Sequence, residues 1–276
     1  MYVELSDGVR LRTMTTGTPS AAPPVVLLHG GPGLWDYLEP IAKLIDDRTV
    51  VHRFDQRGCG GSGPSDDQSM RRLQDDIEEL RLHWGHEKIV VIGHSFGATL
   101  ALTYAASYPD SILRVGYLGG AGTGDWLAQA EAEQLRRMTA AQAARLDQLV
   151  GRKRTQEEET EFRALSWFTD HADRERAWGW ALEDAAVPYP INFAANRAIN
   201  AEANAWSNED RARTAAAVKA PVWFVHGDGD PRPASAVRQL ARHVAQHEFR
   251  LIEGAGHSLY RERPDAVRAI LTELIS

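Results

Sequence analysis

The segment KIVVIGHSFG, residues 88–97, carries the strongest structural signal in the chain. Residues 88–92 form a continuous apolar run after the lysine, as expected of a strand that is covered on both faces. The pentapeptide GHSFG follows at once and opens a helix-like segment at 96–107, which is rich in small apolar residues. A G-x-S-x-G sequence between a strand and a helix places its serine on a sharp turn, where larger residues than glycine would collide with the neighbouring elements. This pattern predicts that the Ser95 hydroxyl is raised above the edge of a sheet.

Ser95 is therefore the candidate nucleophile, and it needs a base, because a serine hydroxyl reacts weakly until its proton is removed. The N-terminus of the helix that follows favours negative charge, which helps an oxyanion to form. His257 is the predicted base, because it lies in the loop GAGHS (residues 254–258) between a predicted last strand at 249–253 and the final helix. The other nine histidines fit less well; His94, for example, adjoins Ser95 and cannot turn back onto it.

The imidazole of the base needs a buried carboxylate to orient it, and HGDGDP at residues 226–231 follows another predicted strand. Asp230 is the predicted acid, because it lies where the loop has cleared the strand end and the next residue, a proline, stiffens the loop. Asp228 remains a rival, since only loop geometry separates the two positions. Asp125, after the strand expected at 112–118, is a more distant option.

Backbone N–H groups are expected to hold the oxyanion of the reaction, and each such donor contributes about 3 kcal/mol. One belongs to Phe96, directly after the nucleophile. The other is predicted at Gly31 within HGGPG (residues 29–33), the loop that follows an apolar strand at 25–28. Glycines let a backbone approach a substrate oxygen closely, and Gly30 is a candidate substrate contact for the same reason.

The loop DQRGCGGSG, residues 55–63, contains the spacing G-x-G-x-x-G that is found in dinucleotide-binding turns. No helix opens on these glycines, because PSDD follows, so a phosphate there would lack the helix N-terminus that usually binds it. We interpret the segment as a structural loop braced by Asp55 and Arg57, with Cys59 as a small loop residue. The sequence predicts no cofactor.

Strands and helices are predicted to alternate along most of the chain. The first two strands, 2–5 and 9–15, flank a tight turn that contains an Asp-Gly step. Further strands are expected at 25–28, 49–54, 88–92, 112–118, 221–225 and 249–253. Helices are expected at 35–45, 69–84, 96–107, 234–245 and 264–275. This succession predicts an α/β fold with a mostly parallel twisted sheet, an N-terminal antiparallel hairpin and helices on both faces.

Residues 123–217 differ from the rest of the chain, because strand-like apolar runs are missing and helical patterns predominate. Helices are expected at 125–150, 157–184 and 192–205. We interpret this segment as a helical cap inserted after the sixth strand, with residues 1–122 and 218–276 forming the core domain. The cap and its edges hold five tryptophans that could line a pocket or glue the cap helices together: Trp126, Trp167, Trp178, Trp180 and Trp206.

The composition excludes several functional classes. The 276 residues include 31 basic and 38 acidic side chains, for a net charge of −7, which argues against a nucleic-acid surface. A single cysteine excludes an internal disulfide, and His83 with His86 would give a metal only two ligands, so no metal site is expected. No apolar run is long enough to span a membrane, and the N-terminus lacks a signal-peptide pattern. We therefore expect a cytoplasmic monomer or small homo-oligomer without nucleic-acid or membrane partners.

The motifs together resemble the α/β-hydrolase superfamily, and specifically the proline iminopeptidase-like hydrolases (peptidase family S33). The resemblance covers both ends of the core and rests on five segments: 29–33, 55–58 with Ser62, 93–97, 227–230 and 256–257. The order serine, aspartate, histidine is also that of α/β-hydrolases. The resemblance implies a serine hydrolase that cleaves amides or short peptides with a free N-terminus through an acyl-serine intermediate.

In that family, carboxylates of the cap bind the substrate's N-terminal ammonium. Two cap segments, 177–183 and 199–204, look distantly similar, which makes Glu183 and Glu202 candidate ligands; both would otherwise be ordinary charges on cap helices. The chain departs from the family by having His94 and Phe96 where glycine and tryptophan are usual, and by a shorter cap. A carboxylesterase or lactonase acting on a neutral small molecule is therefore the alternative. A non-catalytic ligand-binding protein is a more remote one.

Overall fold

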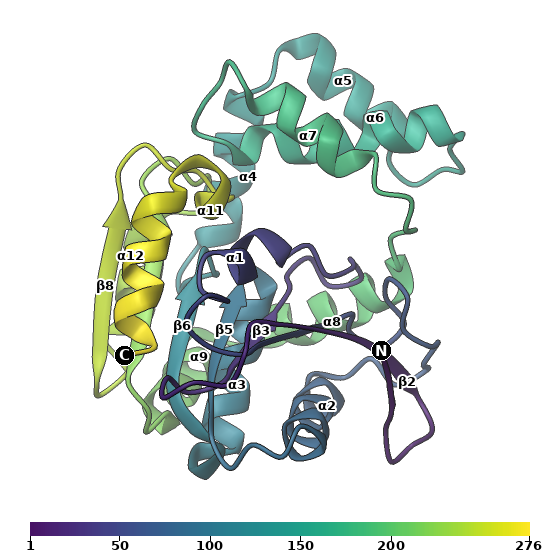
Figure 1. Ribbon diagram of the computed structural model, residues 1–276. Helices are drawn as coiled ribbons and strands as arrows, with labels where there is room; N and C mark the ends of the chain where they lie inside the picture. Colours follow the sequence, from purple (N-terminus) through teal and green to yellow (C-terminus); the bar gives the residue numbers. More distant parts are fainter.

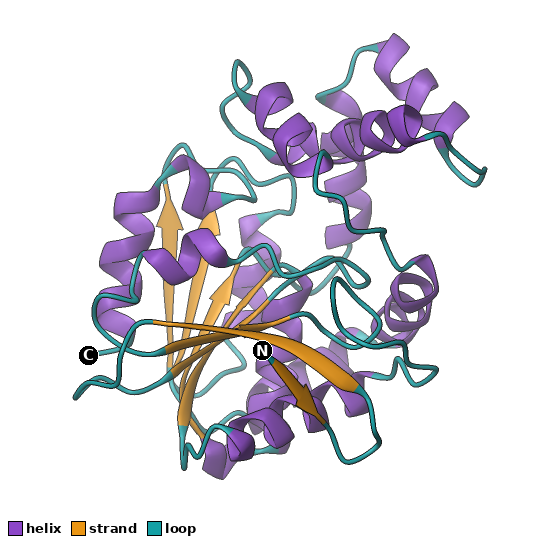
Figure 2. Cartoon of the chain, turned by 45° about the vertical axis from the view of Figure 1, so that its right-hand side comes forward, coloured by secondary structure: helices purple, strands orange, loops and turns teal.

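An eight-stranded sheet runs through the protein, and the computed structural model describes all residues, 1–276 (Figures 1 and 2). The strands are β1 (Tyr2–Glu4), β2 (Arg10–Thr16), β3 (Val25–Leu28), β4 (Val51–Phe54), β5 (Ile89–His94), β6 (Ile112–Leu118), β7 (Val222–Gly227) and β8 (His247–Ile252). They lie in the order β1-β2-β4-β3-β5-β6-β7-β8. β1 and β2 form an antiparallel hairpin, β2 runs antiparallel to β4, and every pairing from β4 to β8 is parallel. The predicted α/β class is confirmed.

Helices cover both faces of this sheet, and four more stand beyond the carboxyl ends of its strands (Figures 1 and 2). One face packs against α1 (Glu39–Lys43), α11 (Leu259–Glu262) and α12 (Pro264–Leu274). The other packs against α2 (Met70–His83), α3 (Phe96–Ser107), α8 (Phe193–Ala205), α9 (Asn208–Ala217) and α10 (Ala234–Ala241). The four outer helices are α4 (Trp126–Arg136), α5 (Ala140–Leu149), α6 (Gln156–Trp167) and α7 (Ala177–Ala185). None of these helices has both the length and the apolar composition needed to cross a membrane.

The central strands are buried on both faces, which explains their continuous apolar sequences. In β3, Val25 and Leu27 belong to the core layer under α1 and α12, whereas Val26 and Leu28 belong to the layer under α2 and α3. All four side chains are fully buried. Successive side chains of a strand point to opposite faces, so an unbroken apolar run fills both layers.

The outer helices form a cap with a small core of its own. Seven buried residues make up this cluster, all from α5 to α7 and the turn between them: Leu149, Ala164, Leu165, Phe168, Ala177, Ala181 and Ala185. The last two helices of the predicted insertion pack differently. Ala195 and Ile199 of α8 and Ala215 of α9 belong to the large core layer under the sheet. The separate helical layer thus ends before residue 193, although the chain returns to the sheet only at β7.

Three predicted helices are shorter or broken in the structure. The helix predicted at 35–45 is reduced to α1, because Pro40 is tolerated only in a first turn. The helix predicted at 125–150 divides into α4 and α5, because Thr139 forms a capping box with Gln142 and starts a new helix. The helix predicted at 157–184 divides into α6 and α7 around a short 3₁₀ turn at Phe168–Asp170.

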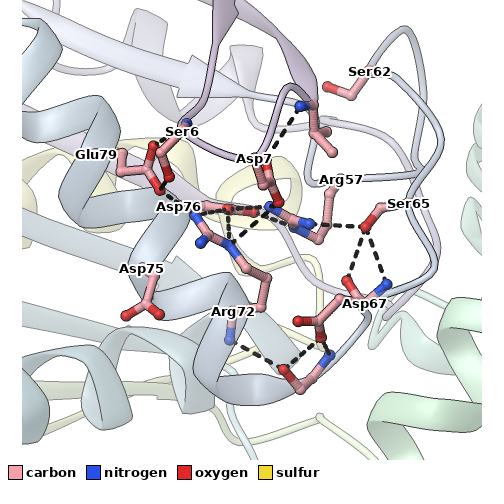
Figure 3. A network of polar contacts seen from close by, with 12 residues as sticks. Ser6, Asp7, Arg57, Ser62, Ser65, Asp67, Arg72, Asp75, Asp76 and Glu79 are labelled. Atoms are coloured by element: carbon pink, nitrogen blue, oxygen red, sulfur yellow. Dashed lines mark hydrogen bonds and ion pairs between the residues drawn. The ribbon is translucent and has the colours of Figure 1, made fainter.

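The glycine-rich loop after β4 is held by charged side chains of the protein itself (Figure 3). Arg57 is fully buried and donates to both carboxylate oxygens of Asp76 on α2, at 2.7 and 2.6 Å. It also donates to Asp7 in the β1–β2 turn, at 2.9 Å, and to Ser65 at 2.8 Å. Asp55 accepts the N–H of Gly61 at 2.8 Å. The loop is therefore tied to the hairpin and to α2.

Candidate active site

The turn between β5 and α3 holds Ser95 in an unusual backbone conformation. Its φ of 59° is the only positive value outside glycine in the chain. A Cβ added at Gly97 would lie 2.0 Å from the Leu28 carbonyl oxygen, and one at Gly93 would lie 1.9 Å from the Gly97 carbonyl oxygen. A Cβ at Gly30 would lie 2.5 Å from that of Ser95. The three glycines are therefore required by close backbone approach around the serine.

His257 and Asp230 form a buried pair. The Nδ1 atom of His257 lies 2.8 Å from the Oδ2 atom of Asp230, whose side chain is fully buried. Asp228, by contrast, is exposed and accepts the N–H of Gly254 at 2.7 Å. Burial alone raises the pKa of Asp230, but the positive charges of His257 and of a neighbouring arginine outweigh it and hold that pKa well below its ordinary value. The loop geometry that the sequence left open thus brings Asp230, not Asp228, to the imidazole.

Ser95 and His257 line the same cavity, which has a volume of about 330 Å³ and lies between the sheet and the cap. The hydrogen bonds of the structure include the His257–Asp230 pair but none between Ser95 and His257. Gly31, with φ of 51°, lines this cavity too. Among the backbone hydrogen bonds outside the regular helices and strands, none uses the N–H group of Gly31 or of Phe96.

A chain of hydrogen bonds connects the Gly31 loop with the His257 loop. The N–H of Gly30 donates to Tyr37 Oη at 2.9 Å, and that oxygen lies 2.9 Å from Nδ1 of His94. The Nε2 atom of His94 lies 2.9 Å from the carbonyl oxygen of His257. A carbonyl only accepts, so Nε2 of His94 carries the proton and Tyr37 donates to Nδ1. Burial and the nearby His257 lower the pKa of His94 to about 3, so the ring is neutral at working pH.

The cap contributes side chains to the cavity that the motifs did not reveal. The break between α6 and α7 places Asp170 and His171 there, and Arg232 enters from the loop after β7. Of the cap tryptophans, only Trp167 lines the cavity. Its ring makes a T-shaped contact with the ring of Trp35, which belongs to the core domain. Further lining residues are Leu34, Gln134, Ser166, Asp184, Tyr260 and Arg261. Asp170 and Asp173 are a weak sequence signal for this break, because aspartate favours turns and caps over helix interiors.

The two glutamates predicted to bind a substrate ammonium do not line the cavity. Glu202 accepts the Met70 N–H at 2.8 Å at the start of α2, away from the cavity. Glu183 is exposed and pairs with Arg261 at 3.1 Å. The carboxylates that do line the cavity are Asp170 and Asp184, and each is paired with an arginine at 2.8 Å. On α7, Glu183 and Asp184 are neighbours that point in different directions, and only Asp184 lines the cavity.

No group of three or more histidine, cysteine, aspartate or glutamate side chains is arranged to hold a metal ion. Cys59, the one thiol, is buried, and burial together with the nearby Asp55 raises its pKa to about 12. A thiol of that pKa is almost entirely protonated at neutral pH, so Cys59 is a poor nucleophile.

Residues 23–264 match the protein family described as alpha/beta hydrolase fold. This span covers most of the chain and includes strands β3 to β8, the serine turn and the loops that carry His257 and Asp230. The chain belongs to that family.

Particular relatives support the resemblance read from the motifs. A proline iminopeptidase of Saccharolobus solfataricus is 44% identical over 89 residues, which cover 30% of this chain and 29% of that protein. The match therefore spans less than a third of the relative's length. Among solved structures, the proline iminopeptidase of Mycobacterium smegmatis has a TM-score of 0.71 at 21% identity, over 100% of this chain and 97% of that one. The enol-lactonase of Burkholderia xenovorans LB400 has a TM-score of 0.71 at 20% identity, over 99% of both chains. At such identities the two structures indicate a shared fold alone.

Proposed function

We propose that the protein is a serine hydrolase that cleaves an amide or ester bond through an acyl-serine intermediate at Ser95. The observation that carries the proposal is the buried Asp230–His257 pair, which faces the same cavity as the positive-φ serine. A buried carboxylate on Nδ1 fixes the tautomer of the imidazole and leaves Nε2 to act as the base.

In the proposed reaction, Nε2 of His257 takes the proton of Ser95 as the serine oxygen bonds to the carbonyl carbon of the substrate. The N–H groups of Gly31 and Phe96 hold the oxyanion that results. His257 then protonates the leaving amine or alcohol, the scissile bond breaks, and the acyl-serine remains. A water molecule, deprotonated by the same imidazole, releases the acid product and restores the serine.

The leading substrate class is short peptides or amides with a free N-terminus. The relatives named proline iminopeptidase support it, as does a cavity of about 330 Å³, which suits a small ligand.

The second candidate is an ester or lactone of a neutral small molecule, and the charges of the cavity favour it. Asp170 and Asp184 each form an ion pair with an arginine, so the cavity has no unpaired carboxylate to bind the ammonium group of a substrate. Burial raises the pKa of Asp184 despite its arginine partner, which further weakens that carboxylate as an anchor for a cation.

One substrate panel separates the candidates. Prolyl and alanyl arylamides should be compared with short-chain nitrophenyl esters and a simple lactone, each with the wild-type protein and with Ser95→Ala. Arylamide turnover supports the aminopeptidase, whereas ester or lactone turnover alone removes it in favour of the second candidate. A fluorophosphonate probe that fails to label Ser95 in the intact protein would instead indicate the non-catalytic ligand-binding protein.

A further inference from the structure

A partly buried arginine, Arg232, joins the predicted catalytic acid to the cap. Nη1 of Arg232 lies 3.2 Å from Oδ1 of Asp230 and 2.8 Å from Oδ1 of Asp170 in the cap. The backbone N–H of Arg232 also donates to Oδ1 of Asp230, at 2.9 Å. The two oxygens of Asp230 therefore have separate partners, because Oδ2 accepts from His257 and Oδ1 is held by Arg232.

The cap residue Asp170 contacts the histidine loop as well. Its carbonyl oxygen accepts the backbone N–H of His257 at 2.7 Å. Its carboxylate accepts from Gln134 of α4 at 3.1 Å, in addition to Arg232. Asp170 is thus bonded to the backbone of the base and, through Arg232, to the side chain of the acid.

We propose that Arg232 and Asp170 are positioning residues that hold the Asp230 carboxylate against His257, and that their opposite charges set the pH range in which His257 acts as a base. The inference rests on the proposed function. It gives Asp170 of the cap a role in setting the charge around His257, in addition to lining the cavity.

The physical argument concerns the charge that His257 experiences. The negative charge of Asp230 favours a protonated imidazole, and the positive charge of Arg232 opposes this effect. Asp170 compensates Arg232 in turn. Burial disfavours ionisation of Asp170, but the charges of Arg232 and His257 prevail and lower its pKa, so the carboxylate stays ionised. Arg232 is charged at every working pH.

Four further elements bring titratable groups near His257. Three of the groups are histidines: His94 at the end of β5, His171 after the 3₁₀ turn, and His226 on β7. Burial lowers the pKa of His94 to about 3 and that of His171 to about 4, so both rings are neutral in the pH range of interest. The fourth group is Glu262 of α11, whose carboxylate accepts the backbone N–H of Gly256 beside His257. The test variants change none of these four groups, so the charges that they vary are those of Arg232 and Asp170.

The test measures how the rate of Ser95 labelling by a fluorophosphonate depends on pH, which requires no knowledge of the substrate. The rate falls at acid pH as the base becomes protonated. In Arg232→Met the midpoint of this fall should move to higher pH by about half a unit to one unit, because Asp230 is no longer offset by a positive charge. In Asp170→Asn, which is nearly isosteric, the midpoint should move to lower pH. Arg232→Lys should restore it toward the wild-type value.

Arg137→Met is the matched control. Arg137 fixes the same cap segment to the core, donating to the carbonyl oxygens of Thr169 at 2.8 Å and Gly229 at 2.9 Å, but it makes no hydrogen bond to Asp230. Its loss should leave the midpoint unchanged, even where the rate falls. If Arg232→Met does not fold, the Asp170→Asn variant alone tests the inference. A shift of its midpoint to lower pH is expected only if the charge of Asp170 acts on His257 as proposed. The inference is overturned if the Arg232 and Asp170 variants have the same midpoint as the Arg137→Met control. If the wild-type protein is never labelled, the proposed function is overturned instead.

Discussion

Ser95 has a strained backbone conformation, which the sharp turn between β5 and α3 requires. A non-glycine residue in the left-handed region costs on the order of 1 kcal/mol or more, and Ser95 is the only such residue in the chain. We expect Ser95→Ala to abolish turnover and leave the unfolding midpoint nearly unchanged, because alanine keeps the strain and removes only the hydroxyl. Ser95→Gly should also be inactive but more stable by about 1 kcal/mol. Urea denaturation and substrate assays on the three proteins measure both effects, and residual turnover in either variant removes Ser95 from the mechanism.

Asp230 and Asp228 offer a second test at the level of single residues. Asp230→Asn should lower kcat by a factor on the order of 10⁴, because Arg232 holds the oxygen of the amide and its NH₂ then donates to Nδ1, which fixes the wrong tautomer of His257. Asp228→Asn should leave kcat within a few-fold of the wild type, since its carboxylate accepts a backbone N–H at the surface. Steady-state kinetics with whichever substrate the panel identifies compares them. Equal losses in the two variants would contradict the role given to Asp230.

Single residues differ in how well the sequence predicted them. Ser95 stands in the local pattern G-x-S-x-G between a strand and a helix, which marks its position in the sequence, although Gly97 is required by the carbonyl oxygen of Leu28 on a neighbouring strand. Asp230 needed the path of a loop, which decides between two aspartates only in three dimensions. Asp170 and Arg232 reach each other across 62 residues, and neither lies in a motif. Long-range pairs of that kind cannot be read from local spacing.

At the level of elements, buried strands were easier to predict than cap helices. β3 begins and ends at its predicted residues, because a strand buried on both faces needs an unbroken apolar run. β6 also has its predicted bounds, although Leu113 is exposed and Arg114 interrupts the apolar run. The cap has weaker amphipathic patterns, so its helix ends depend on capping side chains. Thr139 and Thr155 each form a capping box, with Gln142 and Glu158, and these S/T-x-x-E/Q patterns were visible in the sequence. The Thr139 pattern divides the helix predicted at 125–150, whereas Thr155 precedes the helix predicted at 157–184 and marks only its start.

The hydrogen bonds of Arg57 connect the loop after β4 with α2 and with the β1–β2 turn, and their loss should strongly destabilise the fold (Figure 3). We expect Arg57→Met to destabilise the fold by about 3 kcal/mol, because the buried Asp76 would keep only one arginine partner and Asp7 and Ser65 would each lose a hydrogen bond. Arg72 also contacts Asp76, at 2.9 Å, but is half-buried, so Arg72→Met should cost about 1 kcal/mol. Chemical denaturation of both variants gives the comparison. The double variant Arg57→Met with Asp76→Leu should recover part of the loss, and a purely additive result would show that the unpaired charge is not the cause.

At the level of the whole molecule, the cap and the core are joined by few but well-ordered polar contacts near the cavity. Glu262 of α11 is buried and accepts the N–H groups of Ala172 and Asp173 in the cap, at 2.8 and 2.9 Å. The same carboxylate accepts the N–H of Gly256, beside His257. The segment between α6 and α7 is therefore fixed to the histidine loop. Because these contacts lie at the cavity, the position of the cap and the geometry of the site are mechanically linked.

Three buried histidines make the stability of the whole molecule sensitive to acid. Burial, the largest cause in each case, lowers the pKa of His52 to about 4, of His94 to about 3 and of His171 to about 4, from an ordinary value of 6.5. They lie in the sheet, the serine turn and the cap. Below pH 6.5 these histidines bind protons in the unfolded chain but stay neutral in the folded protein. The free energy of unfolding should therefore fall as the pH falls toward 4, and the contribution of these histidines should be fully retained above pH 6.5.

His52→Gln tests this dependence away from the site. The ring of His52 stacks on Trp84 at 4.1 Å and bonds Thr15 through Nδ1, and glutamine keeps a donor and an acceptor without titrating. The free energy of unfolding should fall between pH 7 and pH 5 by about 2 kcal/mol less in the variant than in the wild type. Any cost of lost packing appears at both pH values and cancels in this difference, which urea titrations at the two pH values provide. Equal falls in the two proteins would mean that His52 gains its proton in the folded state as readily as in the unfolded chain.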